Sequence, residues 1–178
     1  MRRRAALLLS LLLTAAAPLV RASDDPGILF ELDRTRFEVQ VRDLRDAREG
    51  PALRVVIGSP SHPTPAGSFA LHQVVRNPRW TPGQIARGRG AQEKAASSDG
   101  PLGVAKISFG PDGVALHGGA RALLLGKPIS LGCVRALDAD MLVLLDWLEA
   151  AGALGAQRPG VEGEITQPFQ RRARIVVY

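Results

Sequence analysis

An alternation of apolar and polar residues is the clearest pattern in the chain. In residues 37–42, Phe, Val and Val alternate with Glu, Gln and Arg, a period of two that is typical of a half-buried strand. Apolar runs at residues 28–32 and 53–57 flank it, separated from it by turn signals at residues 33–34 and 48–51. Short turns between successive strands predict an antiparallel meander rather than a parallel sheet.

Further strands and loops are predicted along the rest of the chain. The turn signals lie in a Gly/Pro/Ser loop at residues 58–67 and in Gly110–Gly113. Residues 76–101 are rich in Asn, Pro, Gly, Arg and Ser and lack periodicity, which predicts one long irregular loop within the domain. Residues 155–168 are also expected to form a loop. The remaining apolar runs predict strands at residues 69–75, 104–109, 114–117 and 175–178.

One segment has the pattern of an amphipathic helix. Asp138 is a plausible N-cap and Gly152 can end the helix. Between them, apolar residues recur at the spacing of one helix face, at Met141, Leu144, Leu145 and Leu148. With the predicted strands, this helix indicates a mainly β fold, a sandwich or barrel with one principal helix.

The N-terminus has the pattern of a secretory signal peptide. Arg2, Arg3 and Arg4 precede an apolar run from Ala5 to Val20, and Ala22 is suited to the minus one position of a cleavage site. A membrane anchor is the alternative, but the run has 16 residues and contains a proline, whereas a spanning helix needs roughly 20 residues. We therefore predict a signal peptide at residues 1–22 and a single domain at residues 23–178, with no stable membrane anchor after cleavage.

Removal of the predicted signal peptide changes the charge of the protein. The segment carries four arginines and no acidic residue, so the formal charge falls from +6 to +2. This argues against a nucleic-acid partner, which requires a basic patch on the folded domain. The remaining charge is compatible with an acidic polymer outside the cytoplasmic membrane.

The chain has a single cysteine, Cys133, and therefore cannot form an internal disulfide. A lone thiol in an exported protein is open to oxidation, so it either performs chemistry or is a small buried apolar residue. Two further residues favour chemistry. Arg135 would favour the nucleophilic thiolate, and His117, 16 residues earlier, could take the thiol proton. The spacing permits this contact without demonstrating it.

These residues resemble the motifs of the YkuD-type L,D-transpeptidase catalytic domain family. That family has a His-Gly element, a spacer, and Ser-His-Gly-Cys followed by an apolar residue and Arg. Here Leu116-His117-Gly118 is followed by Ser130-Leu131-Gly132-Cys133-Val134-Arg135. The resemblance extends from about Ile28 to the C-terminus and includes further elements at Ile57-Gly58, His62–Gly67, Phe69, Asn77–Pro82 and Gly100–Gly103.

The resemblance implies a cysteine acyl transferase of the periplasm or cell envelope that acts on peptidoglycan stem peptides. Cys133 would be the nucleophile and His117 its base. The implied substrate-binding or oxyanion residues are Arg135, Gly132, Ser130, Gly118 and His62, with the N–H groups of Gly132 and Cys133 holding the oxyanion. No metal and no cofactor are expected, because the histidines lack zinc-like spacing and the cysteine is otherwise assigned. We expect a monomer.

Two positions depart from the family pattern. Leu131 stands where the family commonly has His, and Gly119 where it usually has Thr or Ser. The acceptor could be a stem peptide amine, a wall-anchored protein or water. An L,D-transpeptidase is therefore the first interpretation. A carboxypeptidase or endopeptidase on the same fold, and a non-catalytic wall-binding module, are the alternatives.

Overall fold

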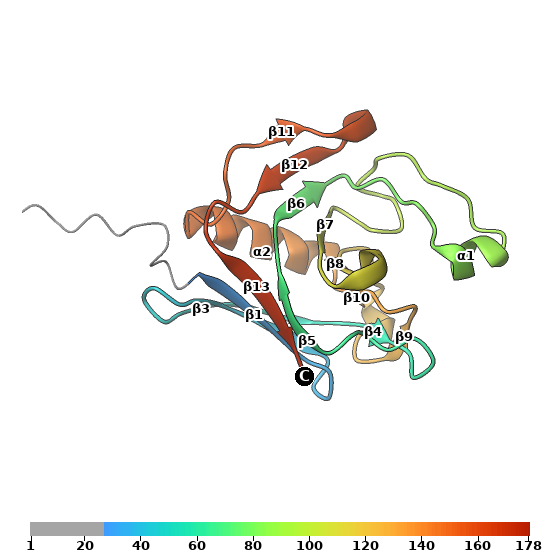
Figure 1. Cartoon of the computed structure of the whole chain (residues 1–178), viewed down its shortest axis with the longest axis horizontal. Helices are drawn as coiled ribbons and strands as arrows, with labels where there is room; N and C mark the ends of the chain where they lie inside the picture. The colour runs from blue at the N-terminus through green and yellow to red at the C-terminus, as the bar shows by residue number, and fades with distance from the viewer. Residues whose placement is uncertain (1–26) are drawn as a thin grey trace, which may run out of the picture.

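The computed structural model describes residues 27–178, and the predicted signal peptide lies outside them. The described residues form a five-stranded sheet, a six-stranded sheet and a two-stranded pair, with one long helix (Figure 1). The fold is mainly β with one principal helix, as the sequence predicts. The strands are β1 Ile28–Asp33, β2 Glu38–Asp43, β3 Arg48–Arg54, β4 Ile57–Gly58, β5 Gly67–Ala70, β6 Gln73–Arg76, β7 Ala105–Ser108, β8 Ala115–His117, β9 Pro128–Ser130, β10 Val134–Arg135, β11 Arg158–Pro159, β12 Ile165–Pro168 and β13 Ala173–Val177.

Strands β1, β2 and β3 form the predicted antiparallel meander. The turn predicted at residues 48–51 is wrong, because β3 already begins at Arg48 and the turn lies at residues 44–47. Strand β3 is at the edge of the five-stranded sheet, where Pro51 can be accommodated. The pairing of β2 with β3 shifts in register between Gln40 and Arg42.

The single strand predicted at residues 69–75 is in fact two strands in different sheets. β5 pairs with β13 in the five-stranded sheet, and β6 pairs with β7 and β12 in the six-stranded sheet. The chain crosses between the sheets at Leu71, which is buried, and His72, which is exposed. Strand β13 inserts between β5 and β1 and runs parallel to β1, so the last strand completes the first sheet.

The six-stranded sheet has the order β10-β8-β7-β6-β12-β11. The loop predicted at residues 155–168 is therefore only partly correct, because this segment contains the β11–β12 hairpin at the sheet edge (Figure 1). Residues 76–101 are mostly irregular, as predicted, and contain the short helix α1, Gln84–Gly88.

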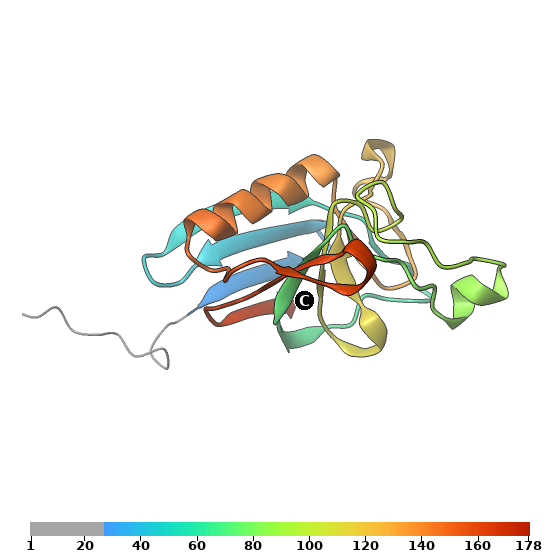
Figure 2. The same cartoon turned by 90° about the horizontal axis from the view of Figure 1, so that it is seen from above.

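Helix α2, Asp138–Ala150, packs along the β1–β3 meander (Figure 2). Its predicted apolar stripe is confirmed, because Met141, Leu144, Leu145 and Leu148 are buried. The predicted N-cap is wrong: Leu137 is the N-cap residue, and Asp138 lies in the first turn with a different set of partners. The side chains of this helix and of both sheets share one core. Within residues 27–178, no helix is both long and apolar enough to cross a membrane.

Candidate active site

The six-stranded sheet brings the predicted histidine and cysteine to one edge. His117 ends β8, and Cys133 immediately precedes β10, which runs parallel to β8. The register aligns Arg135 with His117, and the backbone N–H of Ala136 donates to the His117 carbonyl over 2.8 Å. Successive residues of a strand face opposite sides, so residues two apart share a face. Cys133 and Arg135 therefore lie on the same face as His117, with which Arg135 is aligned.

A cavity of about 880 Å³ opens on this face. His117, Cys133, Arg135 and Leu131 line it from the sheet side. The irregular segment 76–101 contributes another wall, which includes Trp80 and Ile85. Of the sequence-predicted residues, the cavity therefore brings together the histidine, the cysteine and the arginine.

His117 has a defined orientation because its side chain is 3% exposed and its Nδ1 lies 2.7 Å from the Gly118 carbonyl oxygen. A carbonyl can only accept a hydrogen bond, so Nδ1 carries the proton and Nε2 has the lone pair of the neutral ring. A backbone hydrogen bond with Leu102 also acts on the ring and opposes the fall of its pKa. Burial lowers the pKa of His117 to about 4, and the positive charge of Arg135 acts in the same direction. The imidazole is therefore neutral at pH 7 and able to accept a proton.

The thiol of Cys133 is partly buried, and burial raises its pKa above the ordinary value. The backbone N–H of Ala115 and the charge of Arg135 oppose this rise without cancelling it. The thiol is therefore protonated at pH 7 in the free protein. Cys133 and His117 are therefore a neutral thiol and a neutral imidazole rather than a preformed ion pair. The thiol proton would move to the imidazole only during the reaction.

A network of hydrogen bonds shapes the loop that carries Cys133. The buried Ser130 hydroxyl donates to the Cys133 carbonyl over 2.5 Å and accepts the Gly132 N–H over 3.1 Å. Gly132 has a φ of 114°, which an L side chain rarely adopts. The Gly132 N–H is thus bonded to the Ser130 hydroxyl in this structure, and its role in holding an oxyanion stays a prediction. Among the described residues, the N–H of Cys133 has no acceptor.

Thr64 is a site residue that the sequence reasoning missed. Its side chain is 1% exposed, and its hydroxyl donates to the Gly132 carbonyl over 2.8 Å and accepts the Gly58 N–H over 2.9 Å. The nearby His62, which was expected at the substrate rim, is outside the residues that line the cavity and pairs with the Ser61 hydroxyl. In the sequence, Thr64 lies between two prolines within the His62–Gly67 element of the resemblance, and neither feature reveals its distant partner.

Asp138 holds the segment that follows His117. Its Oδ1 accepts the N–H of Val104 over 2.9 Å and the N–H of Gly119 over 3.0 Å, so it joins the ends of two loops to the start of α2. A Cβ atom on Gly118 would collide with this carboxylate, so only glycine fits there. The Gly118 N–H donates to Ala105 over 3.1 Å, and its carbonyl orients His117. Gly118 is thus engaged in holding the histidine.

The sequence profile of the L,D-transpeptidase catalytic domain, of the YkuD type, matches residues 26–166. The chain belongs to this family. No curated protein matches its sequence.

Solved structures of L,D-transpeptidases share the fold. The catalytic domain from E. faecium, acylated by ertapenem, superposes with a TM-score of 0.56 at 14% identity, covering 85% of this chain and 97% of that chain. An L,D-transpeptidase from Mycobacterium tuberculosis H37Rv gives a TM-score of 0.55 at 15% identity, covering 86% of this chain and 58% of that chain. L,D-transpeptidase 3 from the same species gives 0.55 at 16%, covering 86% and 61%. The chain thus spans about three-fifths of the length of these mycobacterial proteins.

The two departures from the family pattern have different structural consequences. Gly119 has a φ of 73°, and a Cβ atom there would lie 3.0 Å from the Pro101 carbonyl oxygen, so the backbone itself requires glycine. Leu131 is 40% exposed and lines the cavity beside Cys133, so it replaces a polar group of the L,D-transpeptidase pattern with an apolar one in the site. In residues 27–178, no group of three His, Cys, Asp or Glu side chains could hold a metal ion.

Proposed function

We propose that this protein is an exported peptidoglycan L,D-transpeptidase in which Cys133 is the nucleophile and His117 is the general base. The observation that carries the proposal is the shared cavity, which is lined both by a buried histidine whose Nδ1 is held by a carbonyl and by the single thiol. The family match and the shared fold support the same chemistry.

The proposed reaction has two half-reactions. In the first, Nε2 of His117 takes the Cys133 proton as the sulfur attacks the carbonyl between an L-centre and a D-residue in a stem peptide. The C–N bond breaks, the proton passes to the departing amine, and a thioester remains. In the second, an acceptor amine gives a proton to His117 and attacks the thioester, and the released thiolate takes that proton back. Water as acceptor would give hydrolysis.

Two neighbouring groups support this assignment. The N–H of Cys133 is available to hold the oxyanion, a contact worth about 3–4 kcal/mol in comparable sites. The buried Nε of Arg135 has no hydrogen-bond partner in the structure. Arg135 is half-buried and lines the cavity, so its guanidinium group can reach a ligand there, and we assign it to a substrate carboxylate. Peptidoglycan stem peptides, with an acceptor that could be a wall-anchored protein, are the proposed partners, and the periplasm or cell envelope the proposed location.

The test is intact-protein mass spectrometry with two acyl donors, a defined tetrapeptide stem and ertapenem, the compound bound to the E. faecium domain. The parent protein should gain the mass of each acyl group, and Cys133→Ala should gain neither. Thermal unfolding of the variant is the control for an intact fold. Adducts of equal yield on the Cys133→Ala variant would refute the assignment of the nucleophile.

Product analysis separates transfer from hydrolysis. With the tetrapeptide donor and an added amine, a transpeptidase gives the new amide, whereas a carboxypeptidase gives only the shortened stem at every acceptor concentration. Binding to purified wall sacculi without any turnover by the parent would indicate the wall-binding module instead.

A further inference from the structure

Asp138 joins two backbone segments beside His117, although it is not among the residues that line the catalytic cavity. One of its oxygens, Oδ1, accepts the N–H of Val104 over 2.9 Å, just after a stretch of chain that lines the cavity. The same oxygen accepts the N–H of Gly119 over 3.0 Å, two residues after the histidine. A single oxygen atom therefore fixes the two segments relative to each other.

These two segments carry the backbone groups that bond to the His117 ring. The Gly118 carbonyl oxygen lies 2.7 Å from Nδ1, and the backbone of Leu102 also forms a hydrogen bond with the ring. Each of these groups is within two residues of an N–H that Asp138 holds. The position of the imidazole therefore depends on a side chain that does not contact it through a hydrogen bond of its own.

The side chain that holds both segments is itself firmly placed. Asp138 lies in the first turn of α2, and Met141 and Leu144 of that helix are buried in the core. A Cβ atom on Gly103 or on Gly118 would collide with Oδ1, so both segments pass directly against this oxygen. A shorter side chain in place of Asp138 would leave a gap there, and both segments would lose the group that holds them.

We propose that Asp138 is a positioning residue for the general base, because its Oδ1 fixes the two segments that hold the His117 ring and so sets where the imidazole lies relative to the Cys133 thiol. This inference rests on the proposed function. Proton transfer itself is left to His117 and Cys133. The positioning acts through hydrogen bonds that both end on one oxygen, and an amide oxygen can also accept two hydrogen bonds.

Two substitutions separate the hydrogen bonds from the charge. Asp138→Asn keeps an oxygen that can accept both N–H groups but removes the charge, whereas Asp138→Ala removes both bonds. Burial, the Gly118 bond and Arg135 all affect the pKa of His117 more than the charge of Asp138 does. That charge raises the pKa, so its removal leaves the imidazole neutral at pH 7, as in the parent protein.

The experiment measures the rate of acylation by ertapenem as a function of ertapenem concentration, per folded molecule, by intact-protein mass spectrometry. Asp138→Ala should lower the limiting rate about a hundredfold, the order of the effect when a catalytic group is displaced by about 1 Å. The concentration that gives half of the limiting rate should hardly change, because Asp138 does not line the cavity. Asp138→Asn should recover most of the limiting rate.

Asp140→Ala is the matched control. Asp140 is the other acidic residue in the first turn of α2, and its side chain holds neither segment, so this variant should keep the parental rate. If Asp138→Ala does not fold, Asp138→Ser takes its place with the same expectation, because its hydroxyl ends one bond short of the position of Oδ1.

Two results would overturn the proposal while leaving the transpeptidase assignment intact. One is a parental limiting rate in Asp138→Ala or, in its place, Asp138→Ser, even with a loss of stability. The other is an equal fall of the limiting rate in Asp138→Ala and Asp138→Asn, which would assign the effect to the charge. If the parent protein is not acylated at all, the proposed function fails, and this inference fails with it.

Discussion

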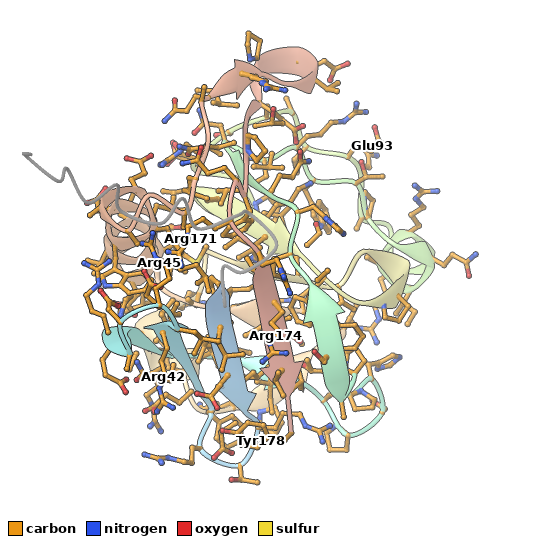
Figure 3. The ribbon with its side chains drawn as sticks, turned by 60° about the vertical axis from the view of Figure 1, so that its left-hand side comes forward. Arg42, Arg45, Glu93, Arg171, Arg174 and Tyr178 are labelled. Atoms are coloured by element: carbon orange, nitrogen blue, oxygen red, sulfur yellow. The ribbon has the colours of Figure 1, made fainter. Side chains whose placement is uncertain are left out.

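Two buried clusters of ionisable groups differ in how completely they are paired. In one, the Asp43 side chain is fully buried and accepts hydrogen bonds from Arg171 over 2.7 and 2.8 Å and from Arg45 over 3.1 Å. Figure 3 labels these two arginines, which lie close together. Both arginines also donate to the Ala151 carbonyl after α2, at 3.0 and 3.3 Å. In the other, at the end of β8, His117 hydrogen-bonds only to backbone groups, and the buried Nε of Arg135 has no partner, among the residues that the structure describes.

The difference separates structure from chemistry. Hydrogen bonds from Arg171, followed by those from Arg45, hold the pKa of Asp43 well below its usual range, so the carboxylate is charged and its lone pairs are used. Burial lowers the pKa of His117 and raises that of Cys133, so both groups are neutral at pH 7. A fully paired cluster stabilises the fold, whereas groups left with unused donors and acceptors in a cavity are suited to a ligand.

Breaking the paired cluster should have the largest effect on stability. Asp43→Asn keeps the shape of the side chain but removes the charge that Arg171 contacts, and the Arg171 side chain is only 8% exposed. Removal of one partner of a buried ion pair costs about 3–5 kcal/mol. We expect a loss of this size in urea-induced unfolding. Acylation by ertapenem below the unfolding transition, per folded molecule, should match that of the parent, and a large loss there would show that the two clusters are coupled.

Titration of stability should distinguish the clusters by pH. His117 has a pKa of about 4 when folded and an ordinary value of 6.5, so between these values the unfolded chain binds the extra proton. Stability should therefore fall as pH drops from 6.5 to 4, by up to about 3 kcal/mol. Asp43 stays charged over this window, because its hydrogen bonds hold its folded-state pKa well below 3.8. Its contribution to the free energy of unfolding is lost only as the pH falls below 3.8.

The matched variant for this titration is His117→Gln, which keeps a polar side chain but cannot titrate. Its unfolding free energy, measured by urea at each pH, should lose most of the dependence between pH 6.5 and 4. If the unfolding free energies of the parent and the variant depend on pH in the same way across that window, another group causes the acid sensitivity. The pKa of His117 would then not be lowered in solution.

The local patterns of the sequence predict the elements well, because alternation and helical spacing reflect burial of neighbouring side chains. The meander and the apolar stripe of α2 were predicted in this way. The division of residues 69–75 between two sheets was not, since it depends on β13 pairing beside β5, about a hundred residues away. Strand β12 was missed because its pairing with β6 is equally non-local.

The same limit applies to the candidate site. The motifs around His117 and Cys133 indicated the pair, and the sheet places both on one cavity. They did not reveal that Asp138 accepts hydrogen bonds from two loops instead of capping its own helix. They also did not reveal that Ser130 occupies the Gly132 N–H. Which donors are already used is a property of the folded backbone, and residue identity alone does not determine it.

Thr64 offers a smaller test, because it is fully paired like the Asp43 cluster but lies beside the reactive loop. Thr64→Val keeps the side-chain shape and leaves the buried Gly58 N–H and the Gly132 carbonyl without their partner. The expected cost is about 1–3 kcal/mol of stability. Because Gly132 precedes Cys133, acylation by ertapenem should also slow, by about tenfold through displacement of the thiol. Thr64→Ser, which retains the hydroxyl, should recover most of both quantities. If Thr64→Val loses stability but is acylated at the parental rate, Thr64 stabilises the fold, as Asp43 does, and does not position Cys133.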